Sequence, residues 1–87
     1  MKTYKLEISS KAQKDLKKID KKVQQRIIKE VLKLKQDRHP QQFKPLVGDK
    51  IAQFRLRVGD YRVLYDVYDY DEVVLILRIG LRKDIYR

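Results

Sequence analysis

The sequence predicts an α+β fold in which two N-terminal helices pack on one face of a small antiparallel sheet, in the order β-α-α-β-β-β. Three observations lead to this prediction. Apolar residues recur with helical spacing over 11–36, alternate with polar residues over 54–68, and form a nearly continuous run over 73–79. A chain of 87 residues has room for one core, so we expect a single domain over 1–87.

The N-terminal part predicts a strand followed by two helices. Residues 4–8 alternate between apolar and polar, as in a short half-buried strand. Ser10 and Gln13 have the spacing of a capping box, which predicts a first helix over 11–19. Asp20 can cap a second helix that runs to about Gln36. The core-facing stripe of this second helix consists of Val23, Ile27, Val31 and Leu34, widened by Ile28 and Leu32.

The segment 38–50 is predicted to be irregular. His39-Pro40 stops the second helix, and Pro45 and Gly48 interrupt the residues that follow. His39 is the only histidine of the chain. It lies next to a proline in a polar loop, so we interpret it as an exposed loop residue without a catalytic partner.

The stretch 54–68 predicts a β-hairpin with two chemically different faces. Gly59-Asp60 lies between two alternating runs and suits a type II′ turn, which places Arg57 directly opposite Arg62. Like charges opposite one another across a ladder are destabilising, so such a face invites an anion. The apolar face comprises Phe54, Leu56, Val58, Tyr61, Val63 and Tyr65, and the other face carries Arg55, Arg57 and Arg62.

The run 73–79 predicts a last strand inside the sheet. Burying Arg78 beneath the helices without a partner would cost several kcal/mol. We therefore expect Leu75, Leu77 and Ile79 to join the core and Arg78 to join the arginine face. The same alternation, continued past Gly80, adds Arg82 to that face, and a C-terminal turn can carry Tyr86 toward it.

The composition limits the class of protein and its partners. Twenty-two Lys and Arg against twelve Asp and Glu give a net charge of +10, which favours nucleic acid, an acidic protein, or both as partners. The chain has no cysteine and hence no disulfide framework or thiolate metal site, which fits a reducing cytoplasm. No stretch resembles a signal peptide or a membrane span. We expect a soluble cytoplasmic protein that needs no cofactor, no metal and no membrane.

The arginine face and the terminal tyrosine favour RNA as the ligand. Guanidinium groups offer fixed forks of donors that suit phosphate, and an aromatic ring can stack on an exposed base. No nucleophile triad or phosphate-binding glycine loop accompanies them. The simplest cleavage chemistry is then attack by the RNA 2′-hydroxyl on its own phosphate. Arginines can orient that phosphate and stabilise its charge, but they transfer protons poorly because a guanidinium stays protonated.

The residues of the hairpin and the C-terminus resemble those of the RelE/ParE superfamily of type II toxins, in particular the RelE branch. The similarity is carried by the segments 55–65 and 80–86 and extends over the whole chain. It implies a RelE-like fold and an endonuclease that enters the ribosomal A site and cuts messenger RNA there without a metal. It also implies an acidic, partly disordered antitoxin as the cognate partner, in a toxin–antitoxin hetero-oligomer.

The same resemblance implies roles for single residues. Arg55 and Arg57 match two basic residues, lysines in the family's pattern, that bind phosphate and assist deprotonation. Arg62 matches the arginine that stabilises the transition state, and Arg82 the one that protonates the leaving group. Tyr86 matches the terminal tyrosine that orients the substrate base. The assignment of Arg78 to RNA binding comes from strand alternation alone.

Two alternatives stay open. The first is an inhibitor of DNA gyrase of the ParE kind, which has the same fold and generally lacks this residue set. The second is a basic binding module whose arginines serve only an acidic partner. Substitution of single arginines separates catalysis from binding.

Overall fold

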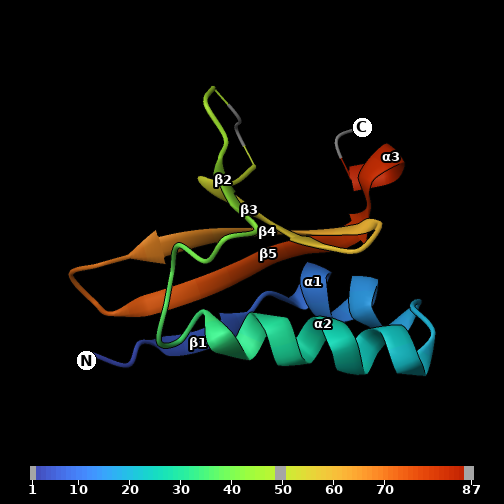
Figure 1. Cartoon of the computed structure of the whole chain (residues 1–87), viewed down its shortest axis with the longest axis horizontal. Helices are drawn as coiled ribbons and strands as arrows, with labels where there is room; N and C mark the ends of the chain where they lie inside the picture. Colours follow the sequence, from blue (N-terminus) through green and yellow to red (C-terminus); the bar gives the residue numbers. More distant parts are fainter. Residues whose placement is uncertain (1, 49–50, 86–87) are drawn as a thin grey trace.

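The chain folds as two helices beneath a sheet, with a third short helix on the opposite side (Figure 1). The computed structural model describes residues 2–48 and 51–85, and within these ranges a sheet of order β1-β5-β4-β3-β2 is flanked by three helices. This confirms the predicted α+β class with α1 and α2 on one face. The elements are β1 (Lys5–Ile8), α1 (Ser10–Lys17), α2 (Lys21–Lys33), β2 (Phe43–Pro45), β3 (Phe54–Val58), β4 (Tyr61–Tyr68), β5 (Val73–Leu81) and α3 (Arg82–Ile85).

The two N-terminal helices begin at side-chain caps. The Ser9 hydroxyl accepts the backbone N–H of Ala12 at 3.0 Å, so the cap lies one residue before the predicted Ser10. Ser9 is also tied to the sheet, because its hydroxyl donates to the Leu77 carbonyl at 3.0 Å. Asp20 caps α2 as predicted, accepting from the N–H of Lys22. Each cap satisfies a backbone donor that the first turn of a helix leaves without a partner.

The main core lies between α1, α2 and the inner face of the sheet. Ile27, Val31 and Leu34 are buried as predicted, and the predicted apolar face of the hairpin packs against them. Ile28 and Leu32, expected to widen this stripe, are exposed instead. The buried side chains that meet the helices from the sheet are Leu56, Val58, Val63, Tyr65, Val74, Ile76 and Ile79.

Aromatic side chains close the core beyond the end of α2. Tyr65 is fully buried, and its hydroxyl donates to the Arg38 carbonyl at 2.7 Å. Burial raises the pKa of Tyr65 well above its ordinary value, which keeps the hydroxyl a donor. His39 is exposed as expected, yet its ring packs edge-on against Phe43, with centroids 4.7 Å apart.

The hairpin has the register that its sequence predicts. Arg57 pairs with Arg62 and Leu56 with Val63 across β3 and β4. A type II′ turn requires a positive φ at its first central residue and a negative φ at its second. Gly59 has φ of 59°, and Asp60 does not have a positive φ, so the turn is of this type. The turn therefore fixes which side chains face away from the helices.

The sheet differs from the prediction at its two edges. β1 pairs with β5 in parallel, whereas the other strands pair antiparallel. Alternation shows which side of a strand is buried but not which strand lies beside it. Within 38–50, predicted to be irregular, β2 pairs with β3. Its last residue is Pro45, and an edge strand tolerates proline because its outer side needs no donor.

The placement of Arg78 on the arginine face was wrong. The ladder between β4 and β5 shifts register at Leu64/Tyr65, and this irregularity inverts the alternation along β5. Val74 and Ile76 therefore face α1 and α2, whereas Leu77 packs on the opposite side and only Ile79 has its predicted place in the main core.

Arg78 instead ties β5 to α1. Its Nε–H donates to Asp15 at 2.8 Å and its Nη2–H to the same carboxylate at 3.4 Å. The carboxylate also accepts the backbone N–H of Ile79 at 3.0 Å. The sequence offered no evident acceptor for Arg78 on the helix side of the sheet. The structure shows that Asp15 of α1 is this acceptor.

A second, smaller core lies on the outer face of the sheet. Leu64 of β4, Ile85 of α3 and Ala52, which precedes β3, are buried together there. This contact anchors α3 beside β4. It therefore holds the first residue of α3, Arg82, near the outer end of the hairpin.

The ion pair between Asp15 and Arg78 yields a stability prediction. Replacing Asp15→Ala leaves a partly buried guanidinium and a backbone N–H without their acceptor, so we expect a loss of about 1–3 kcal/mol in the free energy of unfolding, measured by urea denaturation. Glu30→Ala is the control. It removes only the surface pair with Lys33, which is expected to contribute about 0.5 kcal/mol or less. Equal losses in the two variants would contradict a structural role for Asp15.

Candidate nucleic-acid interface

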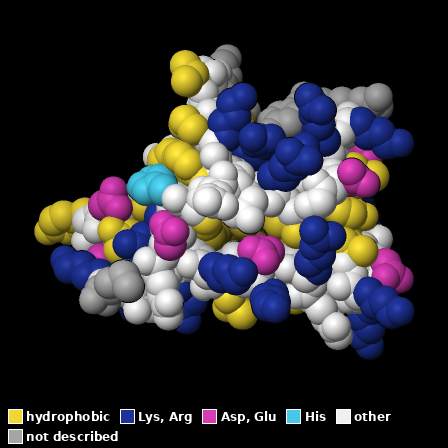
Figure 2. Space-filling view, viewed as in Figure 1, with side chains coloured by type: hydrophobic (Ala, Val, Ile, Leu, Met, Phe, Trp, Pro, Cys, Tyr) yellow, Lys and Arg dark blue, Asp and Glu magenta, His cyan; other side chains and the backbone are white. Residues whose placement is uncertain are grey.

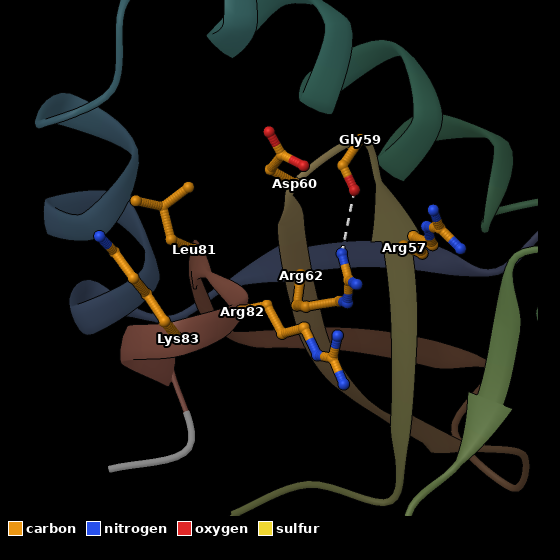
Figure 3. A pocket seen from close by; sticks show the side chains of 7 residues that line it. All are labelled: Arg57, Gly59, Asp60, Arg62, Leu81, Arg82 and Lys83. Carbon is orange, nitrogen blue, oxygen red and sulfur yellow. Dashed lines mark hydrogen bonds between the residues drawn. The ribbon is translucent and has the colours of Figure 1, made fainter.

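A basic pocket lies on the outer face of the sheet, between the hairpin and α3. We call it the Arg62 pocket. It has a volume of about 710 Å³, and Figure 3 shows the side chains that line it. Strands β3 and β4, the hairpin turn and α3 all contribute. The lining residues are Arg57, Gly59, Asp60, Arg62, Leu81, Arg82 and Lys83.

Arg62 is the fixed centre of this pocket. The residue is only 6% exposed, although it carries a charge. Its Nη1 group donates to the carbonyls of Gly59 and Tyr61, each at 3.0 Å. Two bonds to the backbone of the hairpin turn hold the guanidinium in one orientation, so a ligand would meet donors that are already positioned.

Arg57 and Arg82 reach the pocket from different elements. Arg57 stands opposite Arg62 on the neighbouring strand and is exposed. Arg82 is the first residue of α3, and its backbone N–H donates to the Asp60 carbonyl at 3.2 Å, which joins α3 to the hairpin turn. In Figure 3 the side chains of Arg62 and Arg82 extend in the same direction, whereas that of Arg57 leaves β3 on the other side.

A second pocket of about 500 Å³ adjoins the first. We call it the Arg26 pocket. Arg57 and Gly59 line both pockets, so the two are neighbours on either side of these residues. Here Arg55 and Arg57 meet Arg26 of α2. The remaining lining residues are Glu30, Gln41, Gln42, Phe43 and Val58.

The sequence-predicted site residues therefore fall into three groups. Arg57, Arg62 and Arg82 line one pocket, and Arg55 lines the adjoining one. Arg78 is bound to Asp15, as described above. Tyr86, predicted to turn toward this surface, lies outside the described residues.

Three basic residues of this surface were missed in the sequence. Lys83 follows Arg82 in α3, and Lys44 pairs with Arg55 across β2 and β3. Arg26 occupies the α2 position just before Ile27. Lys44 could have been found only by recognising β2, and the place of Arg26 depends on how α2 docks against the hairpin.

The electrostatics of the surface favour an anion. Figure 2 shows basic side chains gathered between the β2–β3 end of the sheet and α3. Asp60 is the one acidic residue among the described residues that line the Arg62 pocket. Guanidinium groups stay charged at neutral pH and form bidentate bonds with phosphate. Within 2–48 and 51–85, no three His, Cys, Asp or Glu side chains are grouped closely enough to hold a metal ion.

None of the helices that the structure describes is long and apolar enough to span a membrane.

Sequence comparison relates this chain to bacterial toxins. Residues 6–86 match the family described as "ParE toxin of type II toxin-antitoxin system, parDE". A 44-residue stretch is 46% identical to the toxin RelG of Mycobacterium tuberculosis. That stretch spans 51% of this chain and 51% of RelG, so the alignment covers about half the length of the relative.

Similar solved structures cover nearly the whole chain. The toxin–antitoxin complex RelBE2 of M. tuberculosis has a chain that is 28% identical, with a TM-score of 0.83 and 97% of each chain covered. The archaeal RelE–RelB complex of Pyrococcus horikoshii OT3 follows at 29% identity and a TM-score of 0.80, covering 94% of this chain and 98% of that one. The isolated E. coli toxin RelE, at 22% identity and a TM-score of 0.75, shares the fold and covers 95% of this chain and 90% of its own.

The match to the family over 6–86 and the RelE-like fold agree with the resemblance found in the hairpin and the C-terminus. The chain belongs to the family of ParE toxins of type II toxin–antitoxin systems, within the RelE/ParE superfamily.

Proposed function

We propose that this toxin is a ribosome-dependent endonuclease that cleaves messenger RNA in the ribosomal A site. One observation carries the proposal. Three arginines from β3, β4 and α3 line one pocket, and the central one, Arg62, is held by two backbone carbonyls. A fixed fork of donors between two exposed arginines suits a phosphate whose charge increases during the reaction.

The reaction that fits these residues needs no protein nucleophile. The 2′-oxygen of the RNA attacks the neighbouring phosphorus, the bond from phosphorus to the 5′-oxygen breaks, and a 2′,3′-cyclic phosphate and a 5′-hydroxyl result. The 2′-hydroxyl loses a proton and the leaving 5′-oxygen gains one. The protein aligns the attack and stabilises charge on the phosphate oxygens.

Each arginine takes a different part in this reaction. Arg62, which is buried and fixed, contacts the non-bridging oxygens in the transition state. Arg82, at the exposed end of the pocket, assists the leaving 5′-oxygen, and Arg57 binds the phosphate from the neighbouring strand. A guanidinium cannot accept a proton near neutral pH. The proton of the 2′-hydroxyl therefore passes to a group other than these arginines.

The proposed partner is a cognate acidic antitoxin. The solved relatives from M. tuberculosis and P. horikoshii are toxin–antitoxin complexes. In this chain an apolar groove of about 140 Å³ lies between the N-terminal helices and the sheet, and the exposed Ile28 and Leu32 belong to its lining. An amphipathic antitoxin segment can cover this groove, and its acidic residues can pair with the lysines around it.

Substitution of the pocket arginines tests catalysis. Arg62→Ala and Arg82→Ala should each lower the rate of messenger-RNA cleavage on programmed ribosomes by about 10²–10³-fold, since each removes a donor that acts on developing charge. Binding of the antitoxin should be unchanged. The readout is the mapped 5′ ends of the transcript, after induction in cells and with purified ribosomes.

Lys17→Ala serves as the matched control, because it removes one exposed positive charge from α1. It should cleave as the unmodified toxin does. Transcripts that stay intact while growth stops would refute the endonuclease proposal.

Inhibition of DNA gyrase is the second candidate, favoured by the description of the matched family as ParE toxins. A supercoiling assay with purified gyrase separates the two. Inhibition that survives both Arg62→Ala and Arg82→Ala would favour this second function.

Antitoxin binding should depend on salt and on the apolar groove. Attraction between the +10 toxin and an acidic chain is screened by salt, so calorimetric titration should show affinity that falls as ionic strength rises. Leu32→Asp places a charge in the groove and should weaken binding by about tenfold or more while leaving RNA cleavage intact. If the affinity changes neither with ionic strength nor in the Leu32→Asp variant, the antitoxin does not bind at this groove.

A further inference from the structure

Apart from Arg57 and Gly59, the residues that line the Arg26 pocket have no role in the chemistry described above. The pocket lies between β3 and α2, next to the Arg62 pocket. Arg57 and Gly59 line both pockets. A strand of RNA that enters one pocket can therefore continue into the other across Arg57.

Arg26 lies where it can contact such a strand. Its guanidinium lies over Gly59, since a Cβ added to this glycine would stand 3.3 Å from Nη1 of Arg26. A glycine at this turn thus supplies both the positive φ and the space for the arginine. The side chain is exposed, and its charge is not required for the main core.

The side chain of Arg55 has a buried donor that a bound anion could satisfy. Its Nε atom is buried and has no hydrogen-bond partner among the described residues. A buried donor on a charged group is costly unless an acceptor reaches it. Glu30 is the carboxylate that lines this pocket in the described chain, and it is bonded to Lys33 at 3.2 Å. Three arginines therefore share a pocket whose single acid already has a partner.

We propose that the Arg26 pocket is a second phosphate subsite, which binds the RNA backbone next to the cleaved nucleotide, with Arg26 as a positioning residue. The inference rests on the proposed endonuclease function. Arg55 and Arg26 bind the flanking phosphate, and Arg57 lies between the two subsites. Gln41 and Gln42 line the same pocket, and their side-chain amides are of the kind that can bond sugar or base edges of that nucleotide. Holding the strand at two points fixes the phosphate in the Arg62 pocket along the direction of attack.

Binding of single-stranded RNA by purified toxin tests the subsite. The probes are fluorescent oligoribonucleotides from two to eight nucleotides, with 2′-O-methyl riboses that prevent cleavage, titrated at several salt concentrations. For the longer probes, Arg26→Ala should raise Kd about tenfold and lower the slope of log Kd against log salt by about 0.7, the value for one phosphate contact on a single strand. For the dinucleotide, Arg26→Ala should change Kd little. Arg26→Lys should keep the slope and recover part of the affinity.

Lys29→Ala is the matched control, because it removes one exposed charge from the same helix without touching either pocket. It should leave both slope and Kd close to those of the unmodified toxin. An equal loss in Lys29→Ala and Arg26→Ala, or a loss in Arg26→Ala that is independent of probe length, would overturn the subsite.

The failure of the subsite and the failure of the proposed function give different results. If Arg62→Ala weakens RNA binding and Arg26→Ala does not, the subsite is refuted while the endonuclease proposal stands. If the unmodified toxin neither binds the probes nor cleaves transcripts on programmed ribosomes, both are refuted. On ribosomes, Arg26→Ala should raise KM and lower kcat by less than Arg62→Ala does, because it loosens the alignment of the phosphate without removing a contact to it.

Discussion

The pairing of β3 with β4 determines where both the charged and the apolar side chains of the hairpin lie. It sets Arg57 opposite Arg62 on the side of the sheet away from α1 and α2, and its turn supplies the Gly59 carbonyl that orients Arg62. Two like charges on facing positions oppose folding. The apolar faces of the same strands offset this cost, because Leu56, Val58 and Val63 are buried against the helices. The hairpin thus uses core packing to hold charges that an anion would neutralise.

The two cores give the surface its shape. The main core fixes the hairpin on α1 and α2, and the smaller core of Leu64, Ala52 and Ile85 fixes α3 beside β4. Arg82 reaches the Arg62 pocket only because α3 begins where β5 ends and is bonded to the turn at Asp60. The outer face is therefore not an uncovered sheet surface but a pocket with walls from the hairpin and from α3.

The sequence predicted what depends on local pattern. The register of the hairpin follows from alternation and a two-residue turn, and so the position of Arg57 opposite Arg62 could be derived from a short stretch of chain. Two features needed the tertiary structure. The irregularity at Leu64/Tyr65 inverts the alternation of β5, and Asp15 is too far from Arg78 in sequence to be recognised as its partner. Arg26 was missed for the same reason, since its role depends on the docking of α2 against Gly59.

In the proposed reaction the residues that act on the phosphate are all arginines, so the work is divided differently from a site in which a titratable side chain removes the proton. Guanidinium groups bind and stabilise charge over the whole physiological pH range, and they leave proton removal to another group. A toxin built in this way gains from a partner that supplies the missing proton acceptor and aligns the RNA. The proposed dependence on the ribosome is in keeping with that division.

Whether the pocket arginines act as one RNA site is best measured by an NMR titration that follows the Nε–Hε signals of the arginines as 2′-O-methyl single-stranded RNA is added to the toxin. If Arg57, Arg62 and Arg82 form one anion site, their signals shift together and saturate at one RNA concentration, while that of Arg78, bound to Asp15, stays in place. Shifts confined to the lysine-rich helices, with the Arg62 and Arg82 signals unchanged, would contradict such a site.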